Sequence, residues 1–347
     1  MGDQAELKWQ TGLLVFTQNY KQDTGEPSFG SDRQADLDDV GVGVYGQATL
    51  TLFDKLDLIA GARFDYESKR GDLLNAGQGV VSRASLGSDF TEGSPQAAAA
   101  YRFAEKQMFY GEVSRGYKAG GFNNATAPSL SLAAYGKEYS LNYEVGYKGT
   151  FHDDRLKVTA AAFYTDWSRL QLNHIGVGGQ TYIANAGGAD SKGLELELAA
   201  RPVKWLELFA GVAYDDARFL SDASDGGLGV SGNHIPYAPD YTANAGAELT
   251  YELCSAVTAY VRGDVELYGG FAYDPSNQAS QSAYSIANFR GGMRGKHWFA
   301  EGWARNAFDS NYVPIAIAYG GFLGAPSGYV GESGAPVTFG VKAGILF

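Results

Sequence analysis

The sequence predicts an all-β fold, an antiparallel transmembrane β-barrel of which about fourteen strands are present. Three observations lead to this fold class. Apolar and polar residues alternate with a period of two along the whole chain. Short turns alternate with long polar links. No apolar run approaches the ~18 residues that a membrane-spanning helix needs.

The last segment, GAPVTFGVKAGILF at residues 334–347, shows the alternation clearly. Successive side chains of a strand point to opposite faces of the sheet. One set of alternating residues is apolar and the other is small or polar, apart from Leu346: Val337, Phe339, Val341, Ala343, Ile345 and Phe347 against Thr338, Gly340, Lys342 and Gly344. The segment therefore predicts a strand with one apolar face and one polar face.

The same pattern recurs along the chain, for example in LDLIAGARFDY (56–66), WLELFAGVAYD (205–215) and VTAYVRGDVELY (257–268). Taken in order, these stretches predict strands centred near residues 13, 46, 62, 98, 111, 146, 161, 194, 211, 245, 262, 288, 304 and 341.

The connections between these strands also alternate. Short turns are predicted at FDKLD, FAEKQM, FHDDR, RPVKW, ELCSAV and RGKHW. Long links rich in Gly, Ser, Asn, Asp and Tyr are predicted at 21–38, 70–90, 119–139, 172–181, 219–237, 270–282 and 314–334. Bacterial outer-membrane barrels have short periplasmic turns and long outer loops. We therefore expect a multi-pass barrel of the cell outer membrane, with lipid on the apolar face, a polar lumen and a last strand that ends at the periplasm.

The composition supports this class over the alternatives. The 347 residues include 47 Gly, 23 Tyr and 19 Phe but only one Cys, and the net charge of −12 argues against nucleic acid as a partner. The start, MGDQAELKWQ, lacks the shape of a signal peptide, which alone indicates a cytoplasmic protein. The strand pattern outweighs that indication. A soluble sandwich or propeller remains the alternative fold.

Motifs for chemistry are weak. GVGVYG (41–46) lies within a predicted strand and GLGVSG (227–232) within a predicted loop, so neither has the helix that a dinucleotide site needs. We expect solvated histidines at two periplasmic turns and in two outer loops, namely His152 and His297, and His174 and His234. SDASDG (221–226) has two Asp that could hold Ca²⁺, but it lacks the Gly and Glu placement of a calcium loop. We expect no enzyme, no cofactor and no metal site.

Several stretches resemble one family. They are YGEVSRGYKAGGFN (110–123), NYEVGYKGTF (142–151), FYTDWSRLQL (163–172), NAGGADSKGLELEL (185–198), YAPDYTANAG (237–246), RNAFDSNYV (305–313) and GVKAGILF (340–347). In order and spacing they resemble the barrel of TonB-dependent outer-membrane receptors, above all siderophore receptors. The resemblance implies a receptor for uptake of a scarce large ligand, with a ferric siderophore as the expected one. It also implies outer-membrane lipid and the TonB-ExbB-ExbD system as partners.

Two parts of the family pattern are missing from the sequence. Receptors of this family carry a globular plug with a TonB-contacting box and have 22 strands. We expect residues 1–347 to be the carboxy-terminal portion of such a barrel domain with no plug domain. The TonB system would act through that absent plug, so this chain alone should not carry out energised uptake. A stand-alone barrel of fourteen strands is the alternative, because an even number permits closure.

The family binds ligands at the outer end of the lumen, where Tyr, Arg, Lys and Asn suit aromatic surfaces and negative oxygens. The resemblance and the predicted outer ends nominate Arg115, Tyr117, Lys118, Asn123, Tyr182, Asn185, Tyr312 and Tyr319. Tyr117 and Lys118 should point to opposite faces of a regular strand. Many of these side chains could instead belong to the aromatic girdle. A passive porin-like channel and a surface binding protein remain the alternative functions.

Overall fold

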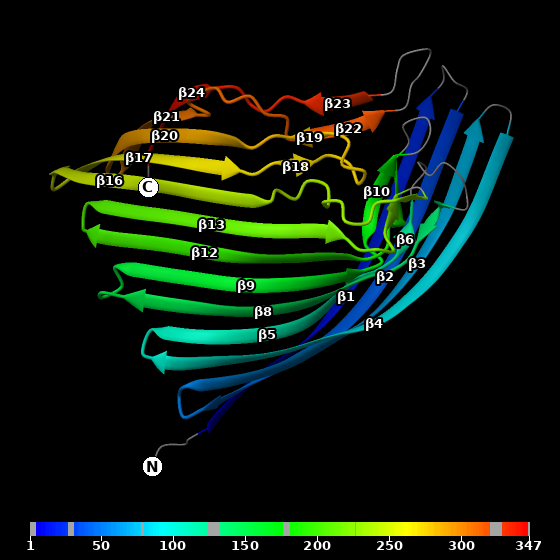
Figure 1. The fold of residues 1–347 in the computed structure, drawn as a ribbon, viewed down its shortest axis with the longest axis horizontal. Helices are drawn as coiled ribbons and strands as arrows, with labels where there is room; N and C mark the ends of the chain where they lie inside the picture. Colours follow the sequence, from blue (N-terminus) through cyan, green and yellow to red (C-terminus); the bar gives the residue numbers. More distant parts are fainter. Residues whose placement is uncertain are drawn as a thin grey trace.

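The computed structural model describes residues 5–26, 31–77, 80–123, 132–175, 181–225, 227–319 and 328–345. One antiparallel sheet of fourteen strands dominates it, and each strand pairs with the next along the chain (Figure 1). The predicted all-β antiparallel fold is therefore confirmed. No helix in the described part of the chain is long and apolar enough to cross a membrane.

All fourteen predicted strand centres lie within strands of this sheet. The strands are β1 (Ala5–Glu26), β2 (Ser31–Leu52), β3 (Leu56–Gly77), β4 (Val80–Ala104), β5 (Gln107–Lys118), β8 (Glu138–Phe151), β9 (Leu156–Ser168), β12 (Ala189–Val203), β13 (Leu206–Phe219), β16 (Tyr241–Cys254), β17 (Val257–Tyr268), β20 (Tyr284–Gly295), β21 (Trp298–Arg305) and β24 (Thr338–Ile345).

The predicted short turns all join neighbouring strands at one end of the sheet. In the first of them, Phe53 and Asp54 have φ values of 53° and 57°, and Lys55 N–H donates to Leu52 O at 3.0 Å. Asp is among the residues that tolerate this left-handed conformation. Ile345 pairs with Trp298, which follows the last short turn. The last strand therefore ends at the short-turn end, as predicted.

Two predicted long links are instead mostly strand. Residues 21–26 and 31–38 extend β1 and β2, and residues 70–77 and 80–90 extend β3 and β4, with pairs such as Lys21↔Asp36 and Asp72↔Ser85. The prediction was wrong because the face that is apolar nearer the short turns is polar here, as at Asp36 and Asp72, so the alternation that marks a membrane strand is lost. In Figure 1, β1 to β4 (blue to cyan) reach further than the other strands at the loop end.

The two faces of the sheet differ as predicted. Val40, Val44 and Val261 are 52%, 52% and 51% exposed on one face. On the other face, polar side chains bind one another, as where Asp57 accepts from Thr51 at 2.8 Å. Some of these contacts skip a strand, so the polar face is the concave one, where side chains converge. Gln96 of β4 thus reaches Gln47 of β2 at 2.7 Å across Gly61 of β3.

The sheet is open along two edges. Among the described residues β1 pairs only with β2, and β24 pairs only with β21. The fourteen strands therefore do not close on themselves in the described structure, which gives no support to the alternative of a stand-alone barrel.

A small apolar core anchors the outer loops to the extended strands. Ala35 of β2, Leu73 of β3 and Ala133 are buried together, with Leu37 packed against them. An added Cβ at Gly71 would come within 3.1 Å of the Phe122 ring, so glycine permits this close packing. The extended strands thus form a wall against which the loops fold.

Candidate ligand-binding site

The outer ends of the later strands carry five two-stranded hairpins, which lie at one end of the sheet in Figure 1. They are β6 (Gly121–Phe122) with β7 (Ala134–Tyr135), β10 (Gln171–Ile175) with β11 (Thr181–Asn185), β14 (Ser224–Asp225) with β15 (Leu228–Gly229), β18 (Phe271–Ala272) with β19 (Ser280–Gln281), and β22 (Ile315–Tyr319) with β23 (Gly328–Glu332). The predicted ligand residues lie in or next to these hairpins and at the end of β5.

Arg115 of β5 is already held by an acidic partner. Its guanidinium lies 3.1 Å from a Glu92 carboxylate oxygen, donates to Gly93 O, and stacks over the Tyr139 ring at 4.8 Å. Lys137 and the Tyr139 hydroxyl also donate to Glu92. Two cations therefore share one carboxylate, and an anionic ligand group at Arg115 would compete with Glu92 rather than meet a free cation.

Tyr117 and Lys118 end the same strand on opposite faces. They pair in regular register with Tyr139 and Glu138, as a regular strand requires. Tyr117 is half-buried and lies within electrostatic range of Asp65 on the polar face. Lys118 is exposed and makes no ion pair with the described residues. The predicted opposition of these two side chains is thus present.

Asn123 and Asn185 act as clasps between loops. The buried Asn123 amide donates to Leu132 O at 2.7 Å and Ile183 O at 2.8 Å, and its oxygen accepts from Ile183 N–H at 2.6 Å. Asn185 accepts from Gly136 N–H at 2.7 Å and donates to Arg169 O at 2.7 Å. Their polar atoms bind the backbone, so each positions the loops that surround it.

The three remaining tyrosines lie further along the chain. Tyr182 of β11 stacks on His174 with ring centroids 5.4 Å apart. Tyr312 stacks on Tyr284 at 4.6 Å, and Tyr284 stacks in turn on Tyr268 at 4.9 Å. Tyr319 ends β22, and its side chain lies outside the described residues. The eight predicted residues are therefore distributed among three places: the end of β5, the clasped hairpins, and the loop after β21.

A cavity that sequence reasoning missed lies among the later loops. Its volume is about 460 Å³, and residues of β10, β11, β14, β22 and β23 and of the segments after β13 and β17 line it. Its walls include Tyr237, Tyr273 and Tyr329, and the aliphatic side chains of Ile315 and Ile317. Ligand pockets of proteins are usually about 300–1,000 Å³ and largely apolar. This cavity has the size and the wall chemistry of such a pocket.

The tyrosine hydroxyls of the cavity bind protein acceptors. Tyr237 donates to Ala316 O at 2.6 Å, Tyr273 to Val313 O at 2.8 Å and Tyr329 to Asp274 at 3.0 Å. Burial and the bond to Asp274 raise the pKa of Tyr329 to about 12, and burial also raises the pKa values of Tyr237 and Tyr273. All three therefore stay neutral at physiological pH.

His174 contradicts the expectation of a solvated loop histidine. It is 4% exposed, and its Nδ1 binds the Asp225 carboxylate of the β14–β15 hairpin. The two residues lie 51 positions apart in the chain. No local pattern joins them, and no sequence signal available here could have found the pair. His234 is also partly buried rather than fully solvated, and it belongs to a second polar network.

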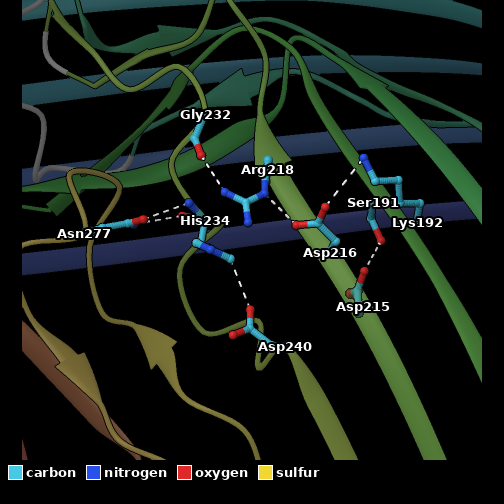
Figure 2. A network of polar contacts seen from close by, with 9 residues as sticks. All are labelled: Ser191, Lys192, Asp215, Asp216, Arg218, Gly232, His234, Asp240 and Asn277. Carbon is cyan, nitrogen blue, oxygen red and sulfur yellow. Dashed lines mark hydrogen bonds and ion pairs between the residues drawn. The ribbon is translucent and has the colours of Figure 1, made fainter.

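That second network ties the outer end of β12 and β13 to the neighbouring loops (Figure 2). His234 Nδ1 lies 3.2 Å from a carboxylate oxygen of Asp240. The backbone N–H of His234 donates to the Asn277 side-chain oxygen at 2.7 Å, and the Asn277 side-chain nitrogen donates to His234 O at 2.9 Å. Arg218 donates to Asp216 at 2.6 Å and to Gly232 O at 3.0 Å. Every group shown in Figure 2 has a protein partner, so the network serves to hold the loops in place.

The described residues contain no group of three or more His, Cys, Asp or Glu that could hold a metal ion. The acidic pair of SDASDG has structural partners instead. Asp222 accepts from Gly188 N–H at 3.1 Å, and Asp225 binds His174. GVGVYG lies within β2, and Cys254 is exposed at a short turn, as the sequence indicates.

Comparison with known families matches residues 2–307 to the family described as TonB dependent receptor-like, beta-barrel. The pesticin receptor of Yersinia enterocolitica is 29% identical over 252 residues, covering 70% of this chain and 35% of the receptor. The ferric-pyoverdine receptor PbuA of a Pseudomonas strain is 23% identical over 294 residues, covering 83% of this chain and 35% of that receptor.

Two solved structures are similar in fold. The ferric yersiniabactin uptake receptor FyuA from Yersinia pestis matches 100% of this chain with a TM-score of 0.84 and 21% identity, and 52% of its own chain is covered. The siderophore receptor PiuA from Acinetobacter baumannii matches 91% with a TM-score of 0.71 and 20% identity, and 45% of its chain is covered. The chain thus spans about a third of the curated relatives' length and about half of these solved receptors.

Proposed function

The chain belongs to the TonB-dependent receptor β-barrel family of the outer membrane, and from this premise we propose that it forms the wall and outer loops of a receptor that takes up a ferric siderophore. Members of this family are transporters rather than enzymes. The fourteen-stranded sheet corresponds to part of such a receptor barrel.

One observation carries the proposed ligand class. A relative that aligns with 83% of this chain is a ferric-pyoverdine receptor. The polar concave face and the loops at its outer end offer the surface that a large polar ligand would cross. The proposal is thus uptake of a ferric chelate across the outer membrane, in place of free diffusion of a small solute.

The end of β5 is the place where we propose that negative oxygens of the chelate make contact. Arg115 and Lys137 converge on Glu92, and Tyr117 lies nearby on the polar face. A ligand oxygen could accept a hydrogen bond from one of the two cations in place of Glu92. The other cation would still pair with Glu92. Tyr312 and Tyr182 offer ring surface, whereas Asn123 and Asn185 would act by holding the loops. Tyr319 stays a proposed contact that rests on the family resemblance. Lys118 is the exposed cation at the rim of this site.

We propose the TonB-ExbB-ExbD system as the partner that energises this uptake, acting through a plug domain. The family uses this route because the outer membrane has no energy source of its own. The sheet's two open edges are compatible with further strands completing the barrel. Uptake would then belong to the complete receptor, and residues 1–347 would supply its outer recognition surface.

A chimaeric receptor tests the proposal. The chain would replace the matching part of the ferric yersiniabactin uptake receptor, keeping that receptor's plug. The chimaera would be expressed in a strain without siderophore receptors. We expect accumulation of radioactive iron from one or more members of a panel of ferric siderophores, and loss of accumulation in a TonB-deficient strain. Accumulation that does not need TonB, or none from any member although the chimaera reaches the outer membrane, would overturn the proposal.

A second candidate function is the binding of a protein at the cell surface. The relatives named pesticin receptors favour it, as does the wall of long strands that projects at the loop end (Figure 1). Deletion of loop 219–237 or 270–282 separates the two functions. Lost protein binding with unchanged iron uptake would favour the surface protein. A passive pore of fourteen strands receives no support from the open sheet.

A further inference from the structure

The loop cavity of about 460 Å³ has a chemistry that differs from the end of β5. Two carboxylates line it, Asp225 and Asp274, together with His174. No Lys or Arg is among the described residues that line it. A group that binds here meets negative charge, whereas a group at Arg115 meets positive charge.

Neither carboxylate has a Lys or Arg partner in the described structure. Asp274 accepts from the backbone N–H groups of Gln278 and Ala279 at 3.2 and 3.1 Å, and from the Tyr329 hydroxyl at 3.0 Å. Among the described residues, Asp225 binds only the His174 ring. A bound cation would gain attraction from both carboxylates without displacing a Lys or Arg.

Aromatic rings form one side of the cavity. Tyr237 and Tyr273 have ring centroids 6.0 Å apart, and both pack on Phe271, at 6.1 and 5.5 Å. Their hydroxyls are used by backbone acceptors, so the rings rather than the hydroxyls are available to a ligand. The faces of aromatic rings attract cations, and groups of rings recognise organic ammonium groups in proteins.

The Nε2 atom of His174 has no hydrogen-bond partner among the described residues. A carboxylate can only accept, so Nδ1 carries the proton that binds Asp225, and Nε2 is left as an acceptor in the neutral ring. Nε2 is also buried. Buried polar atoms are rarely left unpaired. A ligand N–H group in the cavity could donate a hydrogen bond to Nε2.

We propose that this cavity binds a protonated primary or secondary amine carried on a small apolar group. The ammonium would lie between the two carboxylates and the tyrosine rings, and would donate a hydrogen bond to His174 Nε2. The attached apolar group would contact Ile315 and Ile317, which are 43% and 48% exposed without such a partner. The inference goes beyond the proposed siderophore uptake and does not depend on it, because it concerns binding alone.

A series of three probes tests the charge preference on the unsubstituted chain. Phenethylamine, 2-phenylethanol and 3-phenylpropanoate have similar size and differ in charge. Binding would be measured by calorimetry and saturation-transfer NMR at pH 7, in nanodiscs of neutral phosphatidylcholine. We expect phenethylamine to bind at least tenfold more tightly than the alcohol, and the carboxylate to bind more weakly than both. Equal binding of the three probes, or tighter binding of the carboxylate, would overturn the proposal.

A matched pair of variants assigns the binding to this cavity. Asp225 and Asp240 each bind a histidine ring nitrogen, but only the Asp225–His174 pair lines the cavity. We expect Asp225→Asn to weaken phenethylamine binding about tenfold, and Asp240→Asn to leave it unchanged. Asp274→Asn should weaken it as well. Equal effects of Asp225→Asn and Asp240→Asn would contradict the assignment.

The amine-binding proposal and the siderophore-uptake proposal can be tested independently of each other. Loss of amine preference leaves the iron-uptake test of the chimaera untouched, and absent iron uptake leaves the probe series untouched. Circular dichroism and the thermal midpoint of each variant report whether the loops still fold. If Asp225→Asn disturbs the fold, the probe series on the unsubstituted chain still decides the proposal.

Discussion

The first four strands and the later ten build their outer ends in different ways. β1 to β4 continue as paired strands for 22–25 residues. The later strands stop after 8–15 residues and pass into hairpins that side chains hold together. In the first region the backbone hydrogen bonds between paired strands supply most of the structure. In the second region single side chains such as Asn123 carry the structure.

Both regions belong to one sheet that crosses the membrane near its short turns. Large exposed apolar side chains gather toward the short-turn halves of the long strands, as in Val15 of β1 and Val44 of β2 at 66% and 52% exposure. Beyond them the same strands carry polar residues, and Asn19 and Lys21 of β1 both donate to Asp36 of β2. A membrane strand needs only about 9–11 residues. The outer halves of β1 to β4 therefore project into water, which gives the comparison a measurable boundary.

The largest expected effect comes from a charge on the lipid face. Val15→Lys in β1 and Val261→Lys in β17 should each lower the free energy of unfolding by about 2–4 kcal/mol, because both side chains face hydrocarbon. Asn19→Lys lies on the same face of β1 but in its projecting half, and should change stability by less than about 0.5 kcal/mol. Urea unfolding in lipid vesicles measures all three. A penalty at Asn19 equal to that at Val15 would remove the boundary.

The next effect distinguishes clasped loops from paired strands. Asn123→Ala removes the side-chain bonds to the partly buried Ile183 N–H and to two carbonyl oxygens, and should destabilise the outer loops by about 1–3 kcal/mol. Asn19→Ala removes bonds to Asp36 and Asp38 that water can replace, so we expect little change. Hydrogen exchange of residues 181–185 reports the loss. Similar exchange in the two variants would mean that the clasp does not hold the hairpin.

A smaller effect appears at high pH in the β22–β23 hairpin. The pKa of Tyr329 is raised to about 12, so the folded hairpin favours the neutral phenol. This contribution to stability is complete below the unfolded pKa of about 10 and is lost as pH rises towards about 12. The protection factors of residues 328–332, which divide the exchange rate of an unstructured peptide at the same pH by the observed rate, should therefore fall over this range. Tyr329→Phe should abolish the dependence, and an unchanged dependence in that variant would assign it to another group.

The smallest effect is expected at the short-turn end. Lys106 and Asp154 bind at 2.7 Å between two neighbouring turns, with side chains 46% and 60% exposed. Water screens the attraction between two such exposed charges, so the pair adds little to the free energy of unfolding. Lys106→Ala should leave the thermal midpoint unchanged within error. A clear fall in the midpoint would show that these turns contribute more than their backbone geometry.

The strand pattern could be predicted from the sequence because lipid and lumen impose opposite chemistry on alternate residues. Val40, Val42 and Val44 alternate with Gly41 and Gly43. This alternation predicts strand β2 from its own residues, without reference to the strands beside it. The projecting halves of β1 to β4 could not be predicted in this way. The face that is apolar nearer the short turns is polar there, so residues 21–38 and 70–90 have the composition of loops.

The candidate site could be nominated only in part from the sequence, for a different reason. Arg115 and Tyr117 could be nominated because they end a recognisable strand. The loop cavity depends on His174, Asp225 and Asp274, which come from three separate loops. Their proximity follows from how the hairpins fold onto one another, and no period or spacing in one sequence encodes it. The same holds for Asn123, whose partners lie 9 and 60 residues away.

Spin-label accessibility tests the central claim most directly: one sheet crosses the membrane, and its first four strands continue beyond it. Cys254 would be replaced by Ser, and single labels would be placed at Val15, Val44, Lys21 and Asp36 in lipid nanodiscs. We predict that oxygen, which concentrates in lipid, reaches the labels at Val15 and Val44. A water-soluble nickel reagent should reach those at Lys21 and Asp36. Equal access of the nickel reagent to all four labels, or of oxygen to all four, would contradict the account.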